Sequence, residues 1–115
     1  MRNTEPRRLQ VYRNQNGRQP FTEWFYAIRD TKTRTRIRKR LDRLEDGNFG
    51  NHKSVGDGVF ELLLHFGPGY RIYFAHSDNM IILLLCGGDK SSQRQDIVRA
   101  KNYWAQYKEA QGWQN

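Results

Sequence analysis

The sequence has little of what a secreted or membrane-bound protein needs. Its single cysteine, Cys86, lies in an apolar run and has no second cysteine for a disulfide, which indicates a reducing compartment and a buried thiol. No apolar run is long enough to cross a bilayer, and the first ten residues, MRNTEPRRLQ, contain no stretch of the signal-peptide type. We therefore expect a cytoplasmic protein with no membrane partner.

Ligands for a metal ion are also scarce. The three histidines, His52, His65 and His76, are scattered along the chain, and no cysteine or carboxylate stands near them at the spacing of a metal site. We expect no metal site and no cofactor.

What the chain does have is a strong positive charge on a short length. Its 115 residues are the size of one domain, and no repeat, linker or low-complexity segment divides them. We expect one domain over residues 1–115, with the polar residues 1–7 disordered. The 20 lysines and arginines against 12 acidic residues give a formal charge of +8, which favours a polyanionic partner, either nucleic acid or an acidic protein.

The spacing of apolar residues predicts a strand, two helices, three strands and a final helix. Residues 9–12 alternate as a short strand does, and the apolar residues of 21–28 recur at helical spacing. Asp30 or Thr31 caps a second, strongly basic helix, and Ser92 fits a capping box with Gln95 for the last one. This order predicts an α+β fold in which an antiparallel sheet carries the helical pair on one face.

The run GVFELLLHFGPGYRIYF, residues 58–74, predicts a β-hairpin. Two sets of side chains alternate along its first half, so one face of the strand is apolar and the other holds Glu61 and His65. The Gly-Pro-Gly turn supplies the backbone freedom and the fixed proline dihedral that a hairpin needs. The third strand, residues 80–86, is apolar at every position, which suits a strand covered on both faces.

The register of this hairpin decides which side chains meet. If Phe66 pairs with Tyr70, then His65 lies across from Arg71 on the less apolar face. Tyr73 is then close by on the same face, where it is a candidate to stack a base or to donate a proton. We expect this face of the hairpin to carry the site.

These side chains have the chemistry for RNA cleavage without a metal. The reaction needs a base for the ribose 2′-hydroxyl, cations that neutralise the phosphorane, and an acid for the leaving 5′-oxygen. His65 titrates near neutrality and can serve as base or acid. Arg71 offers a bidentate fork to phosphate, and Lys90, in the loop after the last strand, offers a mobile charge. Glu61 orients a cation or acts as the base.

Each of these residues also has a purely structural explanation. An exposed strand histidine is more often only solvated, and Arg71 with Glu61 can form an ordinary cross-strand ion pair. The basic helix is either a solvated face or a surface for phosphate backbones. As a nucleic-acid-binding surface, it would use Arg34, Arg36, Arg38, Lys39, Arg40 and Arg43.

The segments GVFELLLHFGPGYRIYF and IILLLCGGDKSSQRQDIVRAKNYW resemble the addiction module killer proteins, a branch of the RelE/ParE superfamily of toxins from bacterial toxin–antitoxin pairs. The resemblance extends from about Phe21 to Tyr107. It implies a RelE-like α+β fold with an antiparallel sheet, an N-terminal helical hairpin and a C-terminal helix. It also implies a cognate antitoxin, commonly a helix-turn-helix protein in this branch, which covers the active surface.

The resemblance is compatible with two targets. RelE and HigB members cleave messenger RNA, usually on the ribosome, whereas ParE members inhibit DNA gyrase. Arg71 matches the arginine that RelE-type nucleases place beside the scissile phosphate, and Lys90 matches a basic residue in the loop after the last strand. The lysines that RelE carries before the turn are absent, and Glu61 and Leu63 stand in that region.

Three functions follow, in this order. The first is an mRNA interferase, a metal-independent endoribonuclease that associates with the ribosome and arrests translation, because Arg71, Lys90 and His65 together with the basic helix suit a phosphate target. The second is a ParE-type inhibitor of DNA gyrase. The third is a non-catalytic module that binds an antitoxin, which the missing lysines favour.

Overall fold

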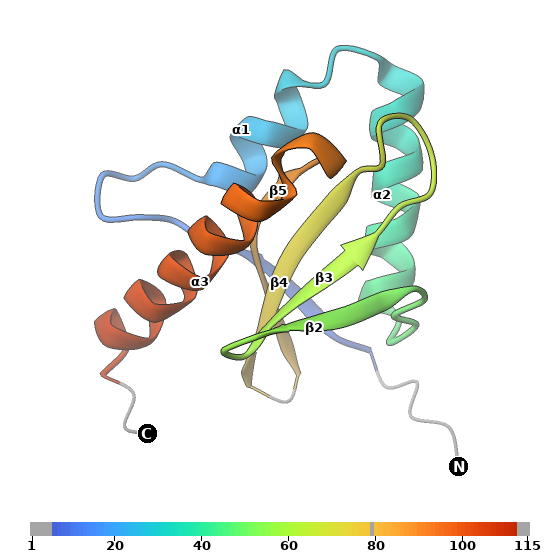
Figure 1. Cartoon of the computed structure of the whole chain (residues 1–115). Helices are drawn as coiled ribbons and strands as arrows, with labels where there is room; N and C mark the ends of the chain where they lie inside the picture. The colour runs from blue at the N-terminus through green and yellow to red at the C-terminus, as the bar shows by residue number, and fades with distance from the viewer. Residues whose placement is uncertain (1–5, 79, 113–115) are drawn as a thin grey trace.

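The computed structural model describes residues 6–78 and 80–112, and its centre is a mixed sheet of five strands (Figure 1). The strands are β1 (Arg8–Val11), β2 (His52–Gly56), β3 (Val59–Leu63), β4 (Arg71–Asp78) and β5 (Ile81–Gly88), in the order β1-β5-β4-β3-β2. The helices are α1 (Pro20–Ala27), α2 (Thr31–Glu45) and α3 (Gln93–Ala110), and a 3₁₀ turn, η1 (Lys90–Ser92), precedes α3. The α+β class and the C-terminal helix are as the sequence predicts.

The sheet is mixed because β1 runs parallel to β5. The other neighbours, β2 with β3, β3 with β4 and β4 with β5, are antiparallel. The prediction of an antiparallel sheet is therefore right for β2 to β5 and wrong for β1. Alternating side chains identify a strand but not its direction, and a parallel pair needs a long connection, which here contains α1, α2 and the other strands.

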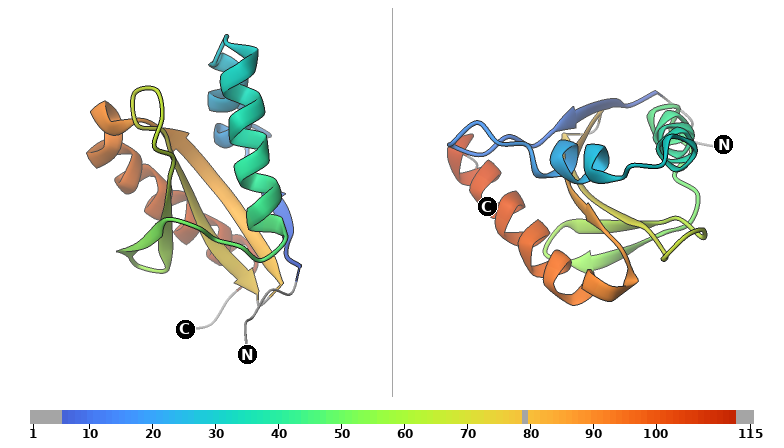
Figure 2. Two further views of the ribbon diagram at one scale, coloured as in Figure 1. Left: turned by 90° about the vertical axis from the view of Figure 1, so that its right-hand side faces the viewer. Right: turned by 90° about the horizontal axis from the view of Figure 1, so that it is seen from above.

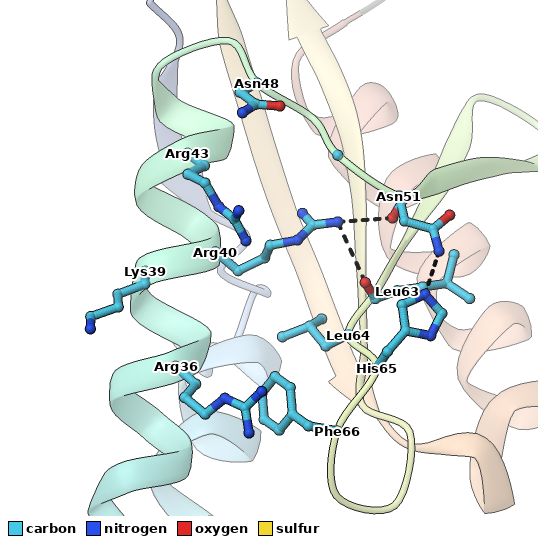
Figure 3. Close-up of a pocket in the computed structure, with 11 residues that line it drawn as sticks. Arg36, Lys39, Arg40, Arg43, Asn48, Asn51, Leu63, Leu64, His65 and Phe66 are labelled. Carbon is cyan, nitrogen blue, oxygen red and sulfur yellow. Dashed lines mark hydrogen bonds between the residues drawn. The ribbon is translucent and has the colours of Figure 1, made fainter.

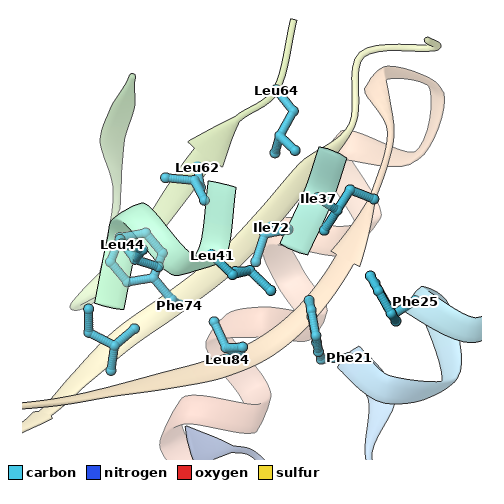
Figure 4. Close-up of a cluster of buried hydrophobic side chains, with 11 residues drawn as sticks. Phe21, Phe25, Ile37, Leu41, Leu44, Leu62, Leu64, Ile72, Phe74 and Leu84 are labelled. Carbon is cyan, nitrogen blue, oxygen red and sulfur yellow. The ribbon is translucent and has the colours of Figure 1, made fainter. Parts of the chain in front are cut away.

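The two faces of the sheet are covered by different helices. Figure 2 shows α1 and α2 on one side of the sheet and α3 on the other. The buried side chains under α1 and α2 are Phe21, Phe25, Ile37, Leu41, Leu44, Leu62, Leu64, Ile72, Phe74, Ile82 and Leu84 (Figure 4). Those under α3 are Tyr12, Val59, Tyr73, Ala75, Leu83, Leu85, Cys86, Ala100 and Trp104. Burial on both faces explains why β5 is apolar at nearly every position.

One of the two predicted helix caps is confirmed and the other is wrong. Pro20 opens α1, and the Asp30 side chain caps α2 by accepting a hydrogen bond from the Lys32 amide. Ser92 makes no side-chain cap for α3; it completes a capping box with Asp89 around η1 instead. The chain thus turns once as a 3₁₀ helix before α3, and this turn carries Lys90.

The start of the described chain is held against the end of α2. The amide of Arg7 donates to the carbonyl oxygen of Glu45 at 2.6 Å, and that of Arg8 donates to Met80 at 2.6 Å. The predicted disorder is therefore wrong for Arg7, while residues 1–5 lie outside the described residues. Within residues 6–78 and 80–112, no helix is both long and apolar enough to span a membrane.

Candidate nucleic-acid interface

Two hollows flank the segment from Leu63 to Phe66, which leads from the end of β3 into the turn. The first, which we call the α2 hollow, measures about 440 Å³ and lies between this segment and α2 (Figure 3). The second, the Arg71 hollow, measures about 360 Å³ and lies between the same segment and the residues around Arg71 and Lys90. Because they share the residues Leu63 to Phe66, the two hollows adjoin, and we call them together the cationic groove.

The groove is strongly positive. Among the described residues that line it, none is an aspartate or a glutamate, and six carry a positive charge, namely Arg36, Lys39, Arg40, Arg43, Arg71 and Lys90. Charges of one sign along a concave surface focus the field and concentrate ligands of the opposite sign. The groove is therefore suited to a polyanion.

Arg71 is the first residue of β4 and is held in place by two partners. Its Nη1 donates to the Gly69 carbonyl oxygen at 2.6 Å, and its Nε lies 3.6 Å from Oε2 of Glu61. Its side chain is 13% exposed, so only part of the guanidinium faces the Arg71 hollow. The ion pair expected between Arg71 and Glu61 is thus present, and it orients the arginine.

Glu61 cannot act as the base. It is fully buried, and its Oε2 accepts hydrogen bonds from the Tyr73 hydroxyl and the Gln93 amide, both at 2.9 Å. Lys53 Nζ lies 3.7 Å from its other oxygen. A carboxylate enclosed in this way does not reach a ribose hydroxyl, so the base role predicted for Glu61 is wrong, whereas its role beside a cation fits.

Tyr73 is also buried, and this corrects its predicted role. It lies under α3 with no exposed surface, and its hydroxyl donates to Glu61. Burial, followed by the hydrogen bond to Glu61, raises the pKa of the Tyr73 hydroxyl far above its usual range. The ring therefore cannot stack on a base. The alternation of the strand correctly puts Tyr73 beside Glu61, but it does not show that α3 covers this face.

His65 lies in the groove, although not by the predicted register. Leu63, not His65, pairs with Arg71 in the β-ladder, and the amide of Leu64 donates to the Tyr70 carbonyl oxygen at 3.0 Å. The turn is therefore longer than predicted, and His65 falls just outside β3. It is exposed there and lines both hollows, so the fold still brings it into one hollow with Arg71 and Lys90.

The His65 ring has a partner that the sequence did not reveal. Its Nε2 forms a hydrogen bond with Nδ2 of Asn51, which donates as an amide nitrogen (Figure 3). With the amide nitrogen as donor, Nε2 is the acceptor of this hydrogen bond. Asn51 stands in a short polar segment that indicates only the end of a helix. It is 14 positions from His65 in the sequence, so the contact forms only in the folded chain.

Three arginines of the basic helix, Arg34, Arg38 and Arg40, make contacts within the fold, and of these Arg40 lines the α2 hollow. Arg34 donates to the carbonyl oxygen of Ile28, and the Arg38 guanidinium lies 5.0 Å from the Phe25 ring centroid. Arg40 is buried and donates to main-chain oxygens. Periodicity does not identify these contacts, because each depends on a segment outside the helix.

Arg36, Lys39 and Arg43 are the exposed cations of the α2 hollow, and their binding of nucleic acid stays a prediction. The guanidinium of Arg36 lies 3.8 Å from the centroid of the Phe66 ring, which fixes its plane over the turn. Phe66 and Asn51 also line the α2 hollow, and no pattern in the sequence marks them as parts of the site.

The histidines are not arranged as metal ligands. Within the described residues, no group of three histidine, cysteine, aspartate or glutamate side chains is placed to hold a metal ion. His52 and His76 instead pack on Phe49, with ring centroids 5.3 and 5.7 Å from it. Burial, and then nearby positive charge, lowers the pKa of His76 below its ordinary value.

Taken together, the fold and the groove define a small α+β protein with a concave cationic surface between a helix, a turn and a 3₁₀ segment. The chain is 44% identical over 81 residues to an uncharacterized protein from Haemophilus influenzae, a match that covers 70% of this chain and 82% of the relative. The chain belongs to the same family as that protein. No family model matches the chain.

Proposed function

We propose that this protein is the toxin of a bacterial toxin–antitoxin pair and that it cleaves messenger RNA without a metal ion. The single observation that carries the proposal is that His65, Arg71 and Lys90 line one hollow, whose described lining contains no acidic residue. These are a titratable base, a guanidinium and an ammonium group, which is the set that phosphodiester cleavage by the 2′-hydroxyl requires.

The burial of Glu61 and Tyr73 leaves the chemistry to these three side chains. The 2′-hydroxyl of the substrate takes the place of the Asn51 amide at Nε2 of His65. Nε2 accepts the hydroxyl proton, and the oxygen attacks the adjacent phosphorus. Arg71, oriented by Glu61, stabilises the negative charge of the pentacoordinate phosphorane. The bond from phosphorus to the 5′-oxygen then breaks, and the ammonium of Lys90 gives the leaving oxygen a proton. The products are a 2′,3′-cyclic phosphate and a free 5′-hydroxyl.

The remaining parts of the proposal are a RelE-like fold, an antitoxin partner and a cytoplasmic location with the ribosome as the place of action. The order of α1, α2, an antiparallel group of strands and α3 supports the fold, with α1 and α2 as the N-terminal helical hairpin. The charge of +8 and the open cationic groove favour a ribosomal substrate, and they equally favour an acidic antitoxin that covers the groove.

The proposal is tested by expressing the chain under tight control and mapping RNA 5′ ends genome-wide, with Arg71→Ala as the comparison. We expect new ends inside translated messages with the wild type, and none of them with the variant. If growth stops while RNA stays intact and DNA supercoiling is blocked, the protein is a gyrase inhibitor and not a ribonuclease. Growth without arrest would leave a non-catalytic antitoxin-binding module.

A further inference from the structure

The α2 hollow contains a buried cation that the proposed cleavage does not use. Arg40 is 8% exposed, and its guanidinium donates to the carbonyl oxygens of Phe49 and Asn51 at 3.0 Å and of Leu63 at 3.4 Å. Within residues 6–78 and 80–112, no carboxylate forms an ion pair with it. Neutral carbonyl groups satisfy its N–H donors but leave its charge uncompensated.

The chain closes around this guanidinium, so the floor of the hollow is preformed. Gly50 has a φ of +61°, and a Cβ atom at this position would lie 2.8 Å from Nη2 of Arg40. A glycine is needed both for the backbone conformation and for the close approach. The segment after α2 is thereby shaped to the arginine that it covers.

The mouth of the hollow adds more positive charge. Arg36, Lys39 and Arg43 follow at spacings of three and four residues, which places them on neighbouring turns of one helix face. The side chains of Lys39 and Arg43 are exposed, and neither side chain has a hydrogen-bond or ion-pair partner among the described residues. Their charges are therefore available to a ligand.

The same hollow offers contacts for a nucleobase. Arg36 presents a guanidinium plane on the Phe66 ring, and such planes stack with unpaired bases. Asn51 uses its Nδ2 on His65, whereas its Oδ1 accepts no hydrogen bond within the described residues. The amide oxygen of Asn51 can accept a hydrogen bond from the edge of a base, and the Arg36 guanidinium can stack on the face of the same base.

We propose that the α2 hollow binds one unpaired nucleotide of RNA, with Arg40, Lys39 and Arg43 at a backbone phosphate and Arg36 and Asn51 at the base. The inference rests on the proposed function and extends it to the nucleotide next to the cut, because the α2 hollow adjoins the Arg71 hollow through Leu63 to Phe66. The volume of about 440 Å³ lies within the range of about 300–1,000 Å³ of small-molecule sites. An acidic peptide would neutralise the charge but would not need the flat stacking surface.

The test is a titration of ¹⁵N-labelled Arg71→Ala protein with the four ribonucleoside 5′-monophosphates, inorganic phosphate and adenosine. The Arg71→Ala background weakens binding in the neighbouring hollow. We expect saturable shifts at the amides of Gly50, Asn51 and His65 with at least one nucleotide, and weaker binding of phosphate or nucleoside alone. Arg43→Glu should weaken nucleotide binding by about tenfold or more.

Arg13→Glu is the matched control. Arg13 is an exposed arginine between β1 and α1, and its reversal changes the net charge by the same amount. If Arg13→Glu weakens nucleotide binding as much as Arg43→Glu does, the loss comes from net charge alone, and the proposed subsite is overturned. If inorganic phosphate binds as tightly as the best nucleotide, the base adds no affinity, and the proposed contacts to the base are wrong. A polyglutamate peptide that binds at these amides, with no response to nucleotides, would assign the hollow to a protein partner.

Cleavage kinetics separate this inference from the proposed function. If the wild type cleaves RNA, Arg43→Glu should raise KM about tenfold and leave kcat nearly unchanged, because the residue binds away from the reacting atoms. An unchanged KM, with no nucleotide shifts, would overturn the subsite and leave the ribonuclease standing. Nucleotide binding at the hollow in a protein that cuts no RNA would overturn the ribonuclease and retain the nucleotide site.

Discussion

Nε of Arg71 lies 3.6 Å from Oε2 of Glu61, a carboxylate with no exposed surface. This carboxylate is therefore a positioning residue for the arginine. Glu61→Gln keeps the shape but removes the charge, so we expect the Arg71 guanidinium to lose its fixed orientation. In steady-state RNA cleavage, kcat should fall by up to about 100-fold with little change in KM.

A change confined to stability would contradict this view of Glu61. Urea unfolding of Glu61→Gln therefore accompanies the kinetics, and a loss of about 1–3 kcal/mol is expected because a buried partner of the ion pair is removed. A variant with that loss and with wild-type kcat would show that Glu61 serves the fold alone.

Tyr73→Phe separates a structural tyrosine from a catalytic one. The hydroxyl of Tyr73 donates to buried Glu61 at 2.9 Å, so its removal should lower the free energy of unfolding by about 1–2 kcal/mol. Because the ring has no exposed surface, RNA cleavage at a temperature where the variant is folded should remain within a few-fold of wild type. Loss of cleavage in the folded variant would argue for a proton-donor role.

Gly50 and Gly17 form a matched pair for the segment over Arg40. Both have a positive φ, +61° and +81°, so an alanine at either position costs about 1–2 kcal/mol in backbone conformation. Only at Gly50 would the new methyl group meet a guanidinium, whereas nothing lies within 4 Å at Gly17. Gly50→Ala should therefore be destabilised by about 1–3 kcal/mol more than Gly17→Ala in urea unfolding. If the two variants lose the same free energy of unfolding, the segment around Gly50 moves away from Arg40 at little cost.

His76 should make stability depend on pH. Burial lowers its pKa in the folded chain, so the unfolded chain binds a proton more readily. The free energy of unfolding should then fall as the pH drops below about 6.5, the ordinary histidine pKa, and level off below the lowered value. Urea midpoints between pH 7.5 and 5 measure this slope. His76→Phe, which keeps an aromatic ring beside Phe49, should flatten it, and an unchanged slope would point to other groups.

The parts of the fold that depend on neighbouring residues could be predicted from the sequence. Phe74 and Tyr73 are neighbours in the sequence and lie on opposite faces of the sheet, as strand alternation requires. Ile37, Leu41 and Leu44 recur at helical spacing and form the buried stripe of α2. The parallel pairing of β1 could not be predicted, because an isolated strand carries no mark of its partner or direction.

The site was predicted less well than the fold because burial by a third element does not appear in a strand pattern. Arg71, Lys90 and His65 do line one hollow, but Tyr73 and Glu61 are enclosed once α3 covers the hairpin. Arg40 has the same spacing as its exposed neighbours, and only the segment from Phe49 to Asn51 distinguishes it.

The place of β1 in the sheet has a consequence for biosynthesis. Arg8 to Val11 leave the ribosome well before Ile81 to Leu84, the residues with which they pair. Such a contact between distant parts of the chain forms late and closes slowly. During translation, β1 therefore has no strand to pair with until β5 has emerged from the exit tunnel.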